Sequence, residues 1–147
     1  MTLSANLASI ETHTMYKHIL LPTDGSDRSV RAIMAGIELA AALNAKVTGL
    51  FINESTYIPG VDEAASPRAE AALSVVAQRA KESGVTSACV AMTGDTPQDS
   101  IIRFANENGC DLIVMGTPGR SRVGKFLLGS VAAAVLADST IPVLLYR

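Results

Sequence analysis

Short apolar runs alternate along this chain with longer segments whose apolar residues recur every three or four positions. Leu112–Met115 shows no polar alternation, which is typical of a parallel strand covered on both faces. Val30, Ile33 and Ile37 lie at the spacing of one helical face. The pattern predicts strands at 18–22, 46–53, 88–92, 112–115 and 142–146, and helices at 27–43, 67–83, 97–108 and 130–138.

Strict alternation of strands and helices predicts an α/β fold with one five-stranded parallel sheet and helices on both faces. We expect the half-Rossmann strand order 3-2-1-4-5, and not the flavodoxin order 2-1-3-4-5. In that order the chain reverses between the first and fourth strands. Asp24 and Gly116 follow those two strands, so both would line one crevice at their carboxyl ends.

Two of the predicted helices begin with a recognisable cap. Ser66 precedes Pro67 and Thr96 precedes Pro97, which combines a capping hydroxyl with proline in the first turn. Asn44 marks the end of the first helix. These boundaries make the helix assignments firmer than periodicity alone.

Composition limits the class of protein. The chain has 147 residues, of which 48% are hydrophobic and 18% charged, so it is long and apolar enough for one globular domain. We expect that domain to span 16–147. Residues 1–15 are rich in Ser, Thr, Ala and Asn and are interpreted as a loose N-terminal extension, with a docked arm as the alternative.

Charge and hydropathy argue against two kinds of partner. A net charge of -2 disfavours nucleic acid, whose binding proteins are usually basic. No apolar run of 18 residues is present, and the N-terminus lacks the basic and apolar blocks of a signal peptide. These features predict a cytoplasmic protein with no membrane partner.

The residues that most often carry catalysis or bind metals do not gather in the sequence. Cys89 and Cys110 lie far apart and are expected to be buried, reduced thiols, although a disulfide stays open. His13 and His18 are expected to be structural or surface residues. Neither a catalytic triad nor a carboxylate pair is evident, so no catalytic residue and no metal-ligating side chain is assigned.

Glycines follow the fourth strand in a pattern that suits an anion. Gly116, Gly119 and Gly129 are spaced as G-x2-G-x9-G, and Ser130 opens the next helix. Glycines let a ligand approach bare main chain, and a helix N-terminus favours phosphate. The plain alternative is that the glycines only form turns and that Ser130 is only an N-cap.

One motif inside this loop is misleading. Gly119 to Phe126 nearly matches the P-loop pattern, but Phe126 stands in place of the hydroxyl that binds magnesium. Arg120, Arg122 and Lys125 either neutralise phosphate or form a solvated basic loop. Asp24 is either a turn former or a hydrogen-bonding partner of a base or ribose.

The chain resembles the universal stress protein family from about Tyr16 to the C-terminus. The resemblance rests on Pro22–Ser26 after the first strand, on Gly94–Pro97 before the third helix, and on the glycine motif followed by Ile141–Leu145. The glycine motif is similar to that of the ATP-binding branch of the family. Pro118 departs from the pattern, since many members have His there, and any role of that histidine in turnover would be absent.

The resemblance implies a set of ligand contacts. Adenosine would meet the end of the first strand, the second strand and the start of the motif, and the phosphates would meet the rest of the motif. Apart from the resemblance, Mg²⁺ would be carried by the phosphates of ATP, and AMP, ADP or a signalling dinucleotide are alternative ligands, because a loop that accepts three phosphates can accept fewer. The residues so implied are Pro22, Thr23, Asp24, Ile52, Met115, Gly116, Gly119, Arg120, Ser121, Gly129, Ser130 and Val131.

The sequence therefore predicts an ATP-binding regulatory module that acts in stress response. The resemblance also implies a homodimer that pairs through the last strand, including Val143 and Leu145, and an exposed apolar edge strand is a physical reason for such pairing. Two alternatives remain: a slow ATPase or phosphotransfer enzyme, and a nucleotide-free interaction protein. The protein partner is not indicated.

Overall fold

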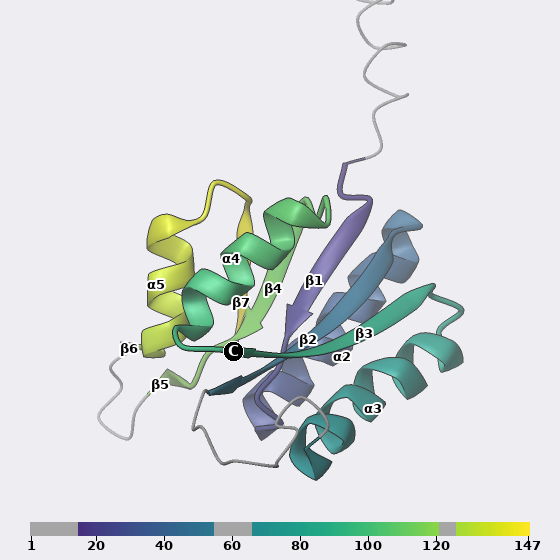
Figure 1. Cartoon of the computed structure of the whole chain (residues 1–147). Helices are drawn as coiled ribbons and strands as arrows, with labels where there is room; N and C mark the ends of the chain where they lie inside the picture. Colours follow the sequence, from purple (N-terminus) through teal and green to yellow (C-terminus); the bar gives the residue numbers. More distant parts are fainter. Residues whose placement is uncertain (1–14, 55–65, 121–125) are drawn as a thin grey trace, which may run out of the picture.

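The computed structural model describes residues 15–54, 66–120 and 126–147. They form a five-stranded parallel sheet in the order β3-β2-β1-β4-β7, which confirms the predicted order (Figure 1). The predicted extension 1–15, apart from Met15, and most of the loop at 54–66 lie outside the described residues. The strands are β1 (His18–Pro22), β2 (Lys46–Glu54), β3 (Ser87–Gly94), β4 (Leu112–Gly116) and β7 (Val143–Tyr146).

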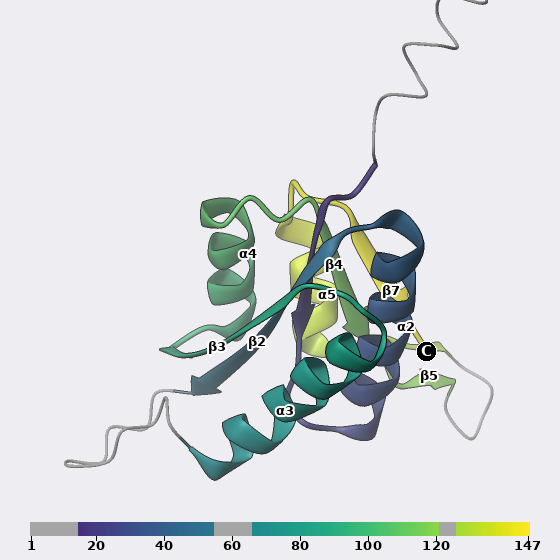
Figure 2. The ribbon, with the colours of Figure 1, turned by 90° about the vertical axis from the view of Figure 1, so that its right-hand side faces the viewer.

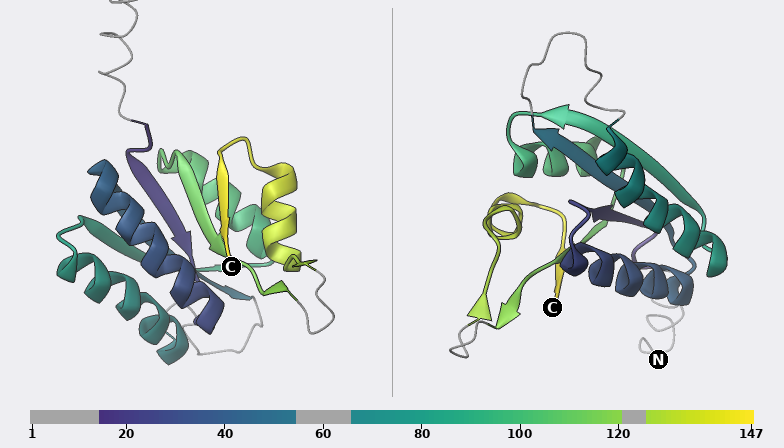
Figure 3. Two further views of the ribbon diagram at one scale, coloured as in Figure 1. Left: turned by 180° about the vertical axis from the view of Figure 1, so that it is seen from behind. Right: turned by 90° about the horizontal axis from the view of Figure 1, so that it is seen from below.

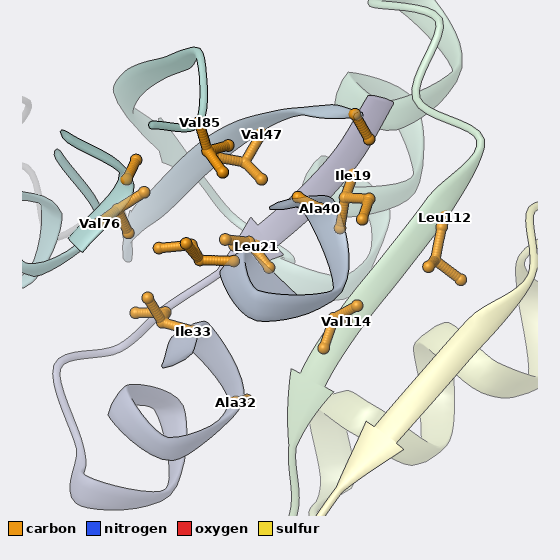
Figure 4. Close-up of a cluster of buried hydrophobic side chains, with 13 residues drawn as sticks. Ile19, Leu21, Ala32, Ile33, Ala40, Val47, Val76, Val85, Leu112 and Val114 are labelled. Atoms are coloured by element: carbon orange, nitrogen blue, oxygen red, sulfur yellow. The ribbon is translucent and has the colours of Figure 1, made fainter. Parts of the chain in front are cut away.

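Helices cover both faces of the sheet, as predicted. Helices α2 (Asp27–Leu43) and α3 (Pro67–Glu82) pack on one face, and α4 (Pro97–Glu107) and α5 (Ser130–Asp138) on the other (Figure 2). Ile19 and Leu21 point from β1 toward α2 and α3, as Figure 4 shows, whereas Leu20 belongs to the cluster on the opposite face. The uninterrupted apolar character of β1 follows from this burial on two sides.

The helix boundaries largely confirm the predicted caps. Ser66 Oγ accepts a hydrogen bond from Ala69 N at 3.1 Å, and Asn44 closes α2 with a left-handed φ of 55°. Helix α4 begins at Pro97 as expected, but the Thr96 side chain makes no capping hydrogen bond. Proline at the first position already lacks an N–H, so it lowers the need for a cap.

The glycine loop contains an element that the sequence pattern does not predict. Strands β5 (Gly119–Arg120) and β6 (Phe126–Leu127) pair antiparallel as a small ribbon (Figure 3). Thr117 fastens the ribbon to the sheet, because its N–H donates to Tyr146 O at 2.9 Å and its hydroxyl donates to Leu127 O at 2.8 Å. Two-residue strands carry too little pattern to be recognised from sequence.

The two cysteines occupy different environments. Both are free thiols; Cys110 is buried as expected, but Cys89 is exposed, so that part of the prediction is wrong. Cys89 lies on β3, which is at the edge of the sheet and therefore has a neighbouring strand on one side only. Across the described ranges, no helix is both long enough and apolar enough to span a membrane.

His18 is a buried structural residue at the amino end of β1. Its Nε2 lies 2.7 Å from Thr48 Oγ1, and Cys110 Sγ is 3.8 Å from the ring. Burial, reinforced by the charge of Lys46, lowers the pKa of His18 below its ordinary value of 6.5. The Asn108 backbone and the Asp111 charge oppose this effect without reversing it.

This environment predicts that the free energy of unfolding depends on pH. The unfolded chain binds a proton at His18 more readily than the folded chain. The contribution of neutral His18 to the free energy of unfolding is therefore fully present above pH 6.5, and it is lost as the pH falls through the lower folded pKa. Urea unfolding at a series of pH values should show this decrease in the native chain. His18→Gln, which cannot titrate, should lack that component. A constant stability difference between the two proteins across this range would contradict the prediction.

Candidate functional site

A cavity of about 620 Å³ opens at the carboxyl ends of β1, β2 and β4. This is the place where the strand order reverses, and where ligands bind in open α/β sheets. The structure brings together most of the residues predicted to bind a ligand. Those that line the cavity are Pro22, Thr23, Asp24, Ile52, Met115, Gly116, Gly129, Ser130 and Val131.

Of the remaining predicted residues, the structure describes Gly119 and only the backbone of Arg120. Gly119 is not among the lining residues and lies in β5, where its φ of +81° is a conformation that favours glycine. The side chain of Arg120 and all of Ser121 lie outside the described residues, as do Arg122 and Lys125. The two alternatives for the basic loop therefore stay open.

Asp24 acts as a turn former and also lines the cavity. Its Oδ1 accepts hydrogen bonds from Ser26 N at 2.9 Å and from Ser29 Oγ at 2.7 Å, which ties the end of β1 to the first turn of α2. Burial alone would raise the pKa of Asp24. The hydrogen bonds from Ser26 and Ser29 outweigh burial, and the charge of Arg28 acts in the same direction, so the pKa lies below its ordinary value. An ionised carboxylate is an acceptor, which suits the hydroxyl and amino groups of a nucleoside and repels phosphate.

Gly116 has a packing role. A Cβ at this position would collide with the carbonyl oxygen of Arg28 and lie 2.7 Å from its carbonyl carbon. The missing side chain therefore lets the first turn of α2 approach the end of β4. This close contact positions Asp24 beside β4.

Gly129 has no such packing reason. A Cβ there would meet no atom of the described residues within 4 Å, and the backbone is extended, with φ -63° and ψ 148°. Gly129 is the N-cap of α5 and Ser130 is the first helical residue, as predicted, which excludes the alternative that Ser130 is only an N-cap. The α5 N-cap makes no side-chain hydrogen bond, and the start of the helix faces the cavity. Unpaired N–H groups and the helix dipole make this end favourable for an anion.

Besides Ile52, the β2 side of the cavity includes residues that the sequence analysis did not single out. Arg68, from α3, donates from Nη2 to Asp24 O at 3.2 Å, and its guanidinium carbon lies 5.9 Å from the centre of the Phe51 ring. Asn53 Oδ1 accepts a hydrogen bond from Ser66 Oγ at 3.2 Å. Arg68 follows no motif, so only its position in the fold reveals it.

The charges of the described lining are balanced. Asp24 and Glu54 are acidic, and Arg28 and Arg68 are basic. No group of three or more His, Cys, Asp or Glu suited to a metal ion occurs among the residues that the structure describes. A polyanionic ligand would therefore rely on backbone N–H groups and arginines within this lining.

Comparison with known protein families matches residues 15–147 to the universal stress protein family. The chain belongs to this family. It is 33% identical over 142 residues to a universal stress protein of Methanocaldococcus jannaschii, and this alignment covers 90% of this chain and 83% of the relative. It is 36% identical over 137 residues to a universal stress protein of Thermus aquaticus, covering 90% of this chain and all (100%) of that protein.

Solved structures support the same relationship. A universal stress protein crystallised in complex with cAMP superposes with a TM-score of 0.72 at 29% identity, over 90% of this chain and 98% of that one. A universal stress protein from Archaeoglobus fulgidus superposes with a TM-score of 0.70 at 25% identity, over 90% of this chain and 99% of that one. The predicted fold and family are thus confirmed.

The two glycines of this universal stress protein should respond differently to alanine. Gly116→Ala should lower the free energy of unfolding by about 1–3 kcal/mol, because the added methyl group overpacks the contact with Arg28. Gly129→Ala should lower it by less than about 1 kcal/mol, since the methyl group meets no described atom and only the weaker N-cap preference of alanine is unfavourable. Urea unfolding of both variants measures the difference. Equal destabilisation would show that the packing assignment of Gly116 is wrong.

Proposed function

We propose that this chain binds an adenine nucleotide in the cavity between the ends of β1 and β4 and acts as a regulatory module in stress response. ATP is the first candidate, and AMP or ADP are the alternatives. One observation carries the proposal: the start of α5, with the side-chain-free Gly129, faces the same cavity as the ionised Asp24. The relative in complex with cAMP supports the adenine nucleotide class, because it has the same fold.

The electrostatics of the cavity favour one orientation of the nucleotide. Phosphate oxygens would lie at the N-terminus of α5, against Gly129, Ser130 and Val131, where N–H groups are available. Phosphates would avoid the carboxylate of Asp24, whereas ribose hydroxyls can donate to it. Adenosine would therefore lie toward β1 and β2. Its contacts would come from Pro22, Thr23, Asp24, Ile52, Met115 and Gly116.

The site fits a nucleotide that brings its own cation. Gly129 leaves room in which phosphate oxygens can approach the backbone. Mg²⁺ would be held by the phosphates, because this ion keeps several waters and binds substrate oxygens readily. Gly119, Arg120 and Ser121 complete the proposed set through the glycine loop, as the family resemblance implies.

Replacing Gly129 by valine tests this placement. The branched side chain would occupy the space assigned to phosphate, so isothermal titration should detect ATP binding in the native chain and none in Gly129→Val. The free structure offers room for the side chain, so the variant should fold. Ala137→Val, at the exposed far end of α5, is the matched control and should bind as the native chain does. Unchanged ATP affinity in folded Gly129→Val would refute the assignment.

We also propose that the protein forms a homodimer through the edge strand β7. This strand ends the sheet, and its outer backbone groups have no neighbouring strand within the described chain. Val143 and Leu145 pack against the core cluster beneath α4 and α5. Leu144 and Tyr146 are 43% and 41% exposed, and a second copy would cover them. An open edge with apolar side chains favours strand pairing.

A charge on β7 should disrupt this dimer. Leu144→Glu places like charges near each other across a two-fold axis, so sedimentation equilibrium should give a dimer for the native chain and a monomer for the variant. Met34→Glu, at an exposed apolar residue on α2, is the matched control and should stay dimeric. A dimeric Leu144→Glu, or a monomeric native chain, would contradict β7 pairing.

A further inference from the structure

Asn53 has an amide group that the fold only half satisfies. It is near the end of β2 and lines the cavity. Its Oδ1 accepts from Ser66 Oγ, while its Nδ2 is buried and has no hydrogen-bond partner. Within the described part of the chain, this is the one buried side-chain nitrogen or oxygen atom without a partner. Exchanging the amide oxygen and nitrogen would not help, because Ser66 engages only one of them.

An unpartnered amide is unfavourable in the free protein. A buried donor without an acceptor costs about 1–3 kcal/mol, and native proteins keep very few such groups. At the wall of a cavity, an acceptor on a ligand can remove this cost. The χ2 torsion of asparagine is broad, so the amide can turn toward the cavity when a bond to the ligand replaces the one that Oδ1 makes with Ser66.

The place of Asn53 in the sheet indicates which part of a ligand it meets. β1 separates β2 from β4, so the end of β2 is about 10 Å across the sheet from the end of β4. The start of α5, where the phosphates are proposed to bind, is on the β4 side. Asn53 therefore lies at the end of the cavity assigned to the base.

The surroundings of Asn53 suit a neutral planar group. Phe51 is on the same side of β2 as Asn53, and Arg68 lies against its ring, while Ile52 and Ile101 add apolar surface to the lining from the opposite face of the sheet. A purine offers ring nitrogens that accept hydrogen bonds, and asparagine is a common partner of adenine in protein–DNA recognition. The neutral amide is thus matched to a base and not to a phosphate.

We propose that Asn53 is a specificity-determining residue whose amide N–H donates to a ring nitrogen of the bound purine. This proposal rests on the proposed function, because it assigns one contact within the same nucleotide site. Asn53 also holds Ser66, the N-cap of α3, so a purely structural role is the competing explanation.

Deaza analogues of ATP test the contact directly. Each of 1-deaza-, 3-deaza- and 7-deaza-ATP replaces one ring nitrogen by carbon. The native chain should bind one of them about five- to tenfold more weakly than ATP, which corresponds to one hydrogen bond. Asn53→Leu removes the donor, so it should bind ATP about five- to tenfold more weakly and should no longer distinguish ATP from that analogue.

Ser66→Ala separates recognition from support of α3. It removes the partner of Asn53 Oδ1 and the cap of α3 but leaves the Nδ2 donor in place. It should therefore keep the native discrimination between ATP and the analogue. Asn53→Asp, which presents an acceptor in place of the donor, should lose the discrimination as Asn53→Leu does.

The possible outcomes are distinguishable. If the native chain binds ATP but none of the three analogues is weaker, the assignment of Asn53 is refuted while the proposed function stands. Discrimination that persists in Asn53→Leu, or disappears in Ser66→Ala, refutes it as well. Failure of the native chain to bind ATP, ADP and AMP would refute the proposed function itself, and the Asn53 contact with it.

Discussion

The pairing of β1 with β4 is the interaction on which the rest of the site depends. Ile19 and Leu20 align with Leu112 and Ile113, so two segments far apart in the sequence run side by side and end at the same edge of the sheet. Every residue in this pairing is buried, so the hydrophobic effect holds the register. A slip of one residue would move each side chain to the opposite face of the sheet, where it would meet the other pair of helices.

This pairing lets a short loop and a helix start meet in one cavity. The turn after β1 carries Asp24, and the segment after β4 leads through the β5–β6 ribbon to Gly129. Hydrogen bonds from Thr117 to Tyr146 O and to Leu127 O hold the ribbon against the end of the sheet. The paired strand ends and these hydrogen bonds thus bring the acidic group and the helix N-terminus to the same cavity.

Glycines of one sequence motif have separate physical roles here. Gly116 permits close packing between β4 and α2, and Gly119 adopts a left-handed backbone. Gly129 meets neither constraint, so its lack of a side chain matters for what enters the cavity. A glycine pattern therefore mixes folding requirements with ligand requirements, and the environment of each Cβ separates them.

The sequence by itself determined the alternation of strands and helices, the strand order and most residues at the carboxyl edge, because apolar periodicity and turn residues are local properties. It did not determine the β5–β6 ribbon or the exposure of Cys89. Only the tertiary structure brought Arg68 to Asp24 and left Asn53 Nδ2 without a partner. Those contacts join elements that are distant in the chain, and no spacing of residues records which side chains meet when helices pack on a sheet.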